Sequence, residues 1–118
     1  MVLVKATADS EAGVLPSKEL VAAMGKFNDE MIAAGVMLAG DGLQANSKGA
    51  RIRFAGAKRS VVDGPFPETK DLVAGYWVIR VKSKEEAIAW MSRAPFEDGE
   101  IEIRQVFEAS DFPAEWGR

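Results

Sequence analysis

Hydrophobic and polar residues alternate along the first stretch of the chain, a spacing that is typical of a β-strand. The alternation covers residues 2–8, and a polar turn is expected at residues 9–13. Residues 36–39 form a short apolar run that predicts a second strand, and we expect Gly40-Asp41-Gly42 to break it. The first third of the chain therefore predicts two strands with a helix between them.

Two helices are predicted from apolar residues that recur every three or four positions. The first begins after Ser17, a residue suited to an N-cap, and ends near Gly35, the type favoured just past a helix end. The second begins with the capping-box sequence Ser83-Lys84-Glu85-Glu86 and is ended by Pro95. The apolar stripe of the first helix consists of Leu20, Met24, Phe27 and Met31.

Three further strand patterns lie in the second half of the chain. Residues 51–54 and 60–63 alternate on either side of Gly56 and predict a β-hairpin. Residues 72–82 carry the strongest strand pattern, and residues 101–107 predict a last strand. Both faces of the 72–82 strand are apolar at its centre, which indicates burial on both sides. One face carries Val73, Trp77, Ile79 and Val81, and the other carries Leu72, Ala74, Tyr76 and Val78.

The order of these elements predicts one α+β domain over residues 1–118. We expect a ferredoxin-like subunit, in which two helices cover one face of a mostly antiparallel sheet. The second sheet face would then leave apolar residues of the 72–82 strand exposed in a lone subunit. Because a patch of that kind usually meets a partner, we expect a homodimer that packs sheet against sheet.

The composition of the chain excludes several kinds of chemistry but does not point to a particular one. The 118 residues are 47% hydrophobic and 28% charged, with a net charge of −3 and no basic stripe, which argues against nucleic-acid binding. The chain has neither cysteine nor histidine, so thiol nucleophiles, imidazole bases and their metal sites are excluded. Acid–base chemistry would need carboxylates, lysine or tyrosine, and no metal or cofactor is expected. No apolar run reaches the roughly 20 residues of a membrane span, and we expect a cytoplasmic location.

An unusual motif lies between the hairpin and the 72–82 strand. Asp63-Gly64-Pro65-Phe66, followed by Glu68-Thr69-Lys70, resembles the signature of the DGPF branch of the YCII-related family. The resemblance extends over about the whole chain and includes Gly42-Leu43-Gln44, Gly75-Tyr76-Trp77, the helix at 86–90 and the strand at 102–106.

The resemblance implies a dimeric α+β barrel, formed by two ferredoxin-like subunits packed sheet to sheet. In some branches of the family a histidine near the first strand pairs with the motif aspartate, and acid–base catalysis is inferred there. This chain has the motif aspartate, Asp63, but no histidine.

Three residues of the motif are candidates for chemistry. Asp63 is either a general base or a turn cap, because aspartate side chains bond to backbone N–H groups two residues on. Glu68 and Lys70 form either a carboxylate–lysine pair or two solvated charges.

Three residues outside the motif are candidates for ligand binding. Arg51 and Arg53 share one face of a strand and could hold the carboxylate or phosphate of a small anionic molecule; alternatively, they discourage pairing at a sheet edge. Tyr76 is expected on the inter-subunit side, where its hydroxyl could line a cleft with Asp63.

Two functions are compatible with these residues. The favoured one is a non-catalytic homodimer that binds a small molecule or serves as an accessory module. The alternative is a cofactor-free lyase or isomerase, in which Asp63 is the base and Tyr76 or an arginine is the electrophile.

Overall fold

The computed structural model describes residues 1–66 and 72–116 of the chain. Within these residues, three α-helices and four strands build the main body, and two further strands form a separate hairpin. In chain order the elements are β1 (Val2–Lys5), α1 (Ala8–Glu11), α2 (Lys18–Ala33), β2 (Met37–Gly42), η1 (Asn46–Lys48), β3 (Ala50–Ala55), β4 (Lys58–Asp63), β5 (Val73–Ile79), α3 (Lys84–Met91), β6 (Ile101–Ile103), η3 (Ala109–Asp111) and η4 (Ala114–Trp116).

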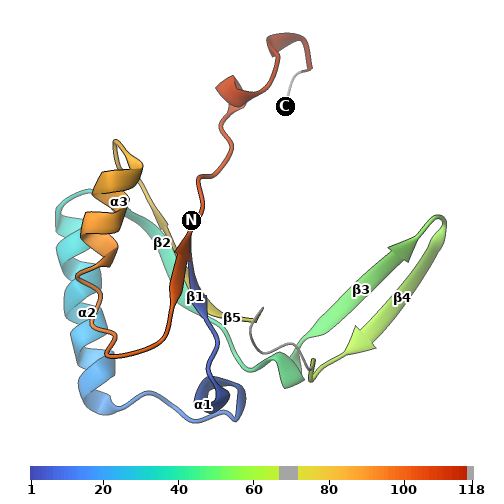
Figure 1. The fold of residues 1–118 in the computed structure, drawn as a ribbon, viewed down its shortest axis with the longest axis horizontal. Coiled ribbons are helices and arrows are strands. Elements are labelled where there is room, and N and C mark those ends of the chain that lie inside the picture. Colours follow the sequence, from blue (N-terminus) through green and yellow to red (C-terminus); the bar gives the residue numbers. More distant parts are fainter. Residues whose placement is uncertain (67–71, 117–118) are drawn as a thin grey trace.

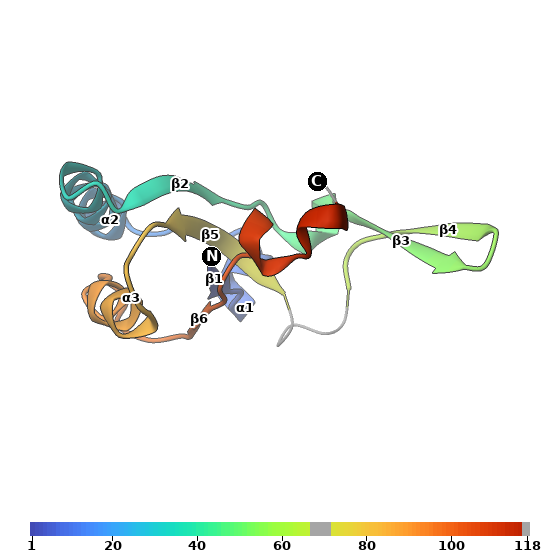
Figure 2. The same cartoon turned by 90° about the horizontal axis from the view of Figure 1, so that it is seen from above.

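The main sheet has the order β2-β5-β1-β6, and all its neighbouring strands are antiparallel. Figures 1 and 2 show α2 and α3 together on one side of this sheet. The α+β class, the ferredoxin-like arrangement and the two helices on one face are therefore confirmed. None of the helices in the described part of the chain combines the length and apolar character that crossing a bilayer requires.

The core lies between the sheet and the two helices, and Trp77 of β5 is its largest side chain. Its indole is 5% exposed and meets the rings of Phe27 and Phe96 edge-on, with centroids 5.9 and 6.2 Å away. The indole N–H donates to Oδ1 of Asn28, 2.9 Å away, so the one polar atom of the ring is satisfied. Phe27, Met31 and Met91 bring α2 and α3 into the same cluster.

Strand β2 continues through Gly40-Asp41-Gly42, so the predicted break at these residues is wrong. The reason is packing against Trp77. A Cβ atom at Gly40 would lie 2.6 Å from Cδ1 of Trp77, so the glycine makes room for the indole inside a regular strand. Asp41 thereby keeps its place in the strand, opposite Tyr76.

Other elements also differ from the sequence prediction. Strand β1 ends at Lys5 instead of residue 8. The expected polar turn at residues 9–13 begins as helix α1, because Thr7 and Ser10 cap each other's backbone N–H groups. Strand β6 ends at Ile103 instead of residue 107. Because Ile103 pairs with Val2, residues 105–107 have no β1 residue beside them.

The caps of the longer helices agree in part with the predictions. Ser17 and Ser83 cap α2 and α3 through their hydroxyls, and Gly35 follows α2 with a φ of 72°. One of the two hydrogen bonds of the capping box at α3 is present, from the N–H of Glu86 to the Ser83 hydroxyl. In place of the other, the Glu86 carboxylate accepts from the N–H of Lys82 instead of that of Ser83.

The opposite surface of the main sheet is not covered by either helix. We call it the open face. Side chains on a strand alternate between faces, so the neighbours of the buried Trp77 project there. Its described residues include Leu3, Asp41, Ala74, Tyr76, Val78 and Glu102.

The predicted hairpin, β3–β4, is confirmed, and it projects from the main body. We call residues 50–63 the arm. Figures 1 and 2 show the arm extending away from the sheet on the side opposite α2 and α3. The radius of gyration is 17.0 Å, whereas a compact domain of this length has about 13–14 Å. The subunit exposes 8935 Å², against about 6,300 Å² for a compact monomer of its mass.

The contact between Gly40 and Trp77 generates a stability prediction. We expect Gly40→Ala to lower the free energy of unfolding by about 1–3 kcal/mol, because its methyl group would overlap the indole. Gly42→Ala is the matched control on the same strand, since a Cβ atom there meets nothing within 4 Å. Urea unfolding followed by tryptophan fluorescence measures both. Equal stability of the two variants would contradict this account of β2.

Candidate functional site

One row of residues crosses the open face from strand to strand. Asp41 lies opposite Tyr76, Tyr76 lies opposite Leu3, and Leu3 lies opposite Glu102. Residues paired in this way project from the same side of a sheet, with their Cβ atoms about 5 Å apart. The row therefore places polar groups at β2, β5 and β6 on a surface whose other residues are largely apolar.

Tyr76 and Asp41 form the polar pair of this row. The Tyr76 hydroxyl donates to Oδ2 of Asp41, 2.8 Å away. This hydrogen bond, the negative charge of the carboxylate and, to a smaller degree, desolvation raise the pKa of Tyr76 above its ordinary value. The phenol thus stays a donor at neutral pH, and the second carboxylate oxygen of Asp41 can accept from a ligand.

Glu102 supplies the other charged end of the row. Its carboxylate lies 3.3 Å from Arg104 and 3.4 Å from Lys5. Hydrogen bonds from Arg104 and then Lys5 lower the pKa of Glu102, so it is ionised at neutral pH. Exposed pairs of this kind add about 0–1 kcal/mol to stability, so their main effect is a charged rim on β6.

The motif residues 63–66 are anchored by η1 and α1. The N–H of Gly64 donates to the carbonyl of Gly49, 3.0 Å away, and the N–H of Phe66 donates to Oδ1 of Asn46. Asn46 in turn donates its backbone N–H to Oε2 of Glu11 at 2.8 Å, and its side-chain amide donates to the same oxygen. Three segments far apart in sequence are therefore tied at the base of the arm.

Gly64 is the point of closest approach in this cluster. A Cβ atom there would lie 1.8 Å from the carbonyl oxygen of Asn46, so no larger residue fits without moving η1. The peptide bond between Gly64 and Pro65 is cis. The motif thus includes a glycine that the contact with η1 requires.

Asp63 is the last residue of β4, where it is exposed and lies opposite Ala50. Its carboxylate forms no hydrogen bond with the residues that the structure describes. The Asp63 carboxylate cannot cap the turn by accepting from the residue two positions on, because that residue is Pro65, which has no N–H group. Within one subunit Asp63 and Tyr76 belong to separate sheets, and the tyrosine hydroxyl bonds to Asp41 instead.

The arginines share one face of β3, with Arg51 opposite Val62 and Arg53 opposite Ser60. The Arg51 guanidinium stacks over the ring of Phe66, with its central carbon 3.9 Å from the centroid. This cation–π contact joins the arm to the motif. Arg53 lies further out on the arm and is exposed. The remaining two candidates, Glu68 and Lys70, lie outside the described residues.

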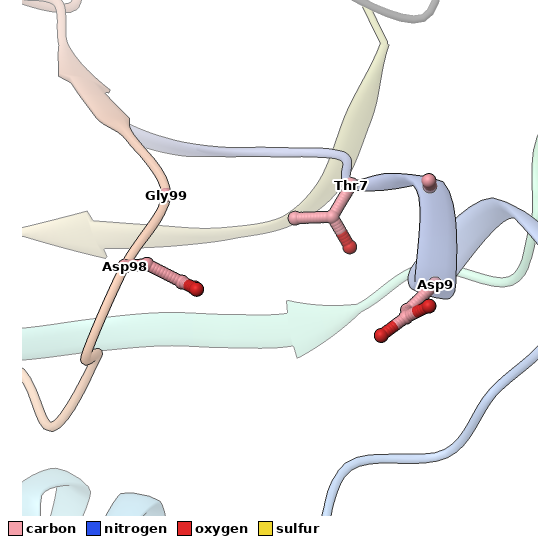
Figure 3. Close-up of a pocket in the computed structure, with 5 residues that line it drawn as sticks. Thr7, Asp9, Asp98 and Gly99 are labelled. Carbon is pink, nitrogen blue, oxygen red and sulfur yellow. The ribbon is translucent and has the colours of Figure 1, made fainter.

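An open depression of about 430 Å³ lies between the start of α1 and the loop before β6. Figure 3 shows the carboxylates of Asp9 and Asp98 on its opposite sides, with Thr7 between them and Gly99 next to Asp98. The hydroxyl of Thr7 is already used to cap α1. Within residues 1–66 and 72–116, no group of three or more acidic side chains is arranged to hold a metal ion.

Residues of these clusters that the sequence did not point to include Asp41, Glu102, Asn46 and Glu11. Asp41 could have been found by extending the β2 alternation through Gly42, which places it on the Tyr76 side of the sheet. No local pattern points to Asn46 or Glu11, because their contacts join positions 20 and 35 residues apart.

The fold and the motif together define a class of small α+β proteins with one uncovered sheet face. The sequence pattern of the YCII-related domain matches residues 1–110 of the chain. The chain belongs to the YCII-related domain family. No curated protein matches it.

The hydrogen bond between Tyr76 and Asp41 can be tested directly, because Tyr76 is the only tyrosine of the chain. We expect absorbance titration of the phenolate to give a pKa above the ordinary value in the wild type, and a lower one in Asp41→Asn. Asp29→Asn, an exposed carboxylate change on α2, is the control. Since the folded-state pKa is raised, the stability from this pair is full below about pH 10 and is lost as pH rises through the raised pKa. Equal values in wild type and Asp41→Asn would show that the bond is absent.

Proposed function

We propose that this YCII-related protein is a non-catalytic homodimer that binds a small molecule between two open faces. The observation that carries the proposal is the Tyr76–Asp41 pair, a polar site on a sheet face that no helix covers. We also assign the chain to the DGPF branch, on the strength of residues 63–66.

The exposed area of the subunit supports the dimer. The excess over a compact monomer, about 2,600 Å², is roughly three times what one partner buries in a standard interface. Packing two open faces at the usual spacing of about 10 Å would cover Leu3, Ala74 and Val78 of each subunit. The same packing would enclose Tyr76 and Asp41.

The chemistry of the row indicates what kind of molecule fits. Asp41 retains an acceptor oxygen, so the ligand needs a donor such as an amine, amide or hydroxyl. Leu3 and Val78 offer apolar surface to its body. Arg53, which lies on the arm and not in the row, is an exposed guanidinium that can pair with a carboxylate, phosphate or sulfonate. A small anionic molecule with an apolar body meets all three requirements.

A cofactor-free lyase or isomerase is the second candidate. It is favoured by one observation, that the Asp63 carboxylate has no hydrogen-bond partner among the described residues. A base in this role would need a partner subunit to desolvate it, because it is exposed in one subunit.

The dimer is tested by placing a charge on the open face. We expect Val78→Asp to convert a dimer into a monomer, because the interface would bury a carboxylate without a partner. Ile32→Asp is the matched control, since Ile32 is an exposed apolar residue on α2, away from the open face. Sedimentation equilibrium at micromolar concentration distinguishes the two. A wild type that sediments only as a monomer would overturn the proposal.

The ligand site is tested with 8-anilinonaphthalene-1-sulfonate, which combines an N–H donor, an apolar body and an anionic group. We expect its affinity to fall about 10-fold in Asp41→Ala, as loss of one charged hydrogen bond of ~1.5 kcal/mol predicts. Asp29→Ala should leave the affinity unchanged. Fluorescence titration measures both, and equal affinities in the two variants would exclude Asp41 from the site.

A further inference from the structure

We infer that the arm of each subunit docks on the partner subunit, so that two copies of this chain exchange their β3–β4 hairpins. The inference rests on the proposed homodimer and adds to it a second interface, formed by the apolar face of the arm. The exchange would make each Tyr76–Asp41 row part of a surface that is closed by residues of both copies.

The length and direction of the arm carry the first step. Each strand of the arm has six residues, which span about 20 Å. The arm extends on the side of the sheet that the open face occupies, as Figures 1 and 2 show. A partner sheet stacked on the open face would lie about 10 Å away. An arm twice as long as this spacing must therefore pass along the body of the partner.

The two faces of the arm differ sharply in character. One face carries Ile52, Phe54 and Val61, which are 56%, 69% and 68% exposed, and Ile52 pairs with Val61 across the hairpin. Arg59 also lies on this face, opposite Phe54, and its guanidinium carbon is 4.6 Å from the centroid of the Phe54 ring. The other face carries Arg51 and Arg53. An isolated two-stranded hairpin is marginally stable in water at best. Among the described residues Arg59 stacks on Phe54, but all three apolar side chains still stay more than half exposed, so this face needs a further surface to cover it.

Charge identifies a second copy of this chain as the occupant. The arm contains four basic residues and one acidic residue, a net charge of +3. Because the whole chain carries −3, the remaining residues carry −6. A basic arm and an acidic body on the same molecule are complementary between copies, which favours association and fixes orientation.

The body offers an apolar surface near its edge strand for this contact. Leu38 of β2 and Leu43, just after β2, are 54% and 51% exposed. Leu43 stays beside β5, because its N–H donates to the carbonyl of Ala74 at 2.8 Å. The partner's arm would cover these two leucines with its apolar face, and Arg59 on that face would bring a positive charge toward Asp41.

The test changes one face of the arm at a time. Ile52→Asp/Val61→Asp puts two carboxylates on the apolar face, and Ser60→Asp/Val62→Asp puts two on the opposite face of the same hairpin. Both variants alter the net charge of the arm equally, so a difference between them reports the docked face alone. We expect the first to raise the dimer Kd by roughly 100-fold or more and the second by less than about 5-fold.

Amide hydrogen exchange of the arm provides a readout that needs no change in the arm. We expect residues 50–63 to be protected in the wild-type dimer and to exchange rapidly in Val78→Asp, whose arm has no partner. Equal effects of the two arm variants, or equally fast exchange in both proteins, would overturn arm docking while the dimer stands. A wild type that is monomeric would overturn the proposed dimer and the docking together.

Discussion

The burial of the Trp77 indole is the constraint on which the rest of the structure depends. The ring fills the space between the sheet and the helices, and its N–H is satisfied by Asn28. Because a strand alternates, burial of Trp77 on one side places Tyr76 on the other. Because Gly40 has no side chain, it leaves space for the ring, and Asp41 stays paired with Tyr76. One packing contact therefore determines both the core and the polar pair on the open face.

The same arrangement leaves the subunit with about 2,600 Å² more exposed surface than a compact monomer of its mass. Among the described residues eight hydrophobic side chains are buried, while apolar side chains of the arm and of the C-terminal segment stay exposed. Phe107 and Phe112 pack on each other, with ring centroids 5.1 Å apart, and Figure 1 shows their segment rising beyond the sheet. In the proposed homodimer the open face and the arm would become interior.

Local sequence pattern was sufficient for the features that local physics controls. The N-caps at Ser17 and Ser83, the hairpin around Gly56 and the burial of Trp77 follow from nearest neighbours and from alternation. Gly40-Asp41-Gly42 was misjudged because glycine weakens a strand on average, whereas here a tryptophan on the neighbouring strand needs the space. The role of Asn46 could not be predicted from local sequence, because its partners lie in segments that come together only on folding.

Among the described residues, the arm joins the body of the subunit at its base, where Gly64 packs against η1 and Asn46 bonds to Glu11. Its length and sequence can therefore change without repacking the core. If the arm docks on a second copy as proposed, and two diverged copies of such a gene were expressed in one cell, changes in the arm would decide whether their products mix or stay apart. Substitutions in the hairpin could then alter which copies recognise each other, while the residues of the main sheet that form the proposed binding site stay unchanged.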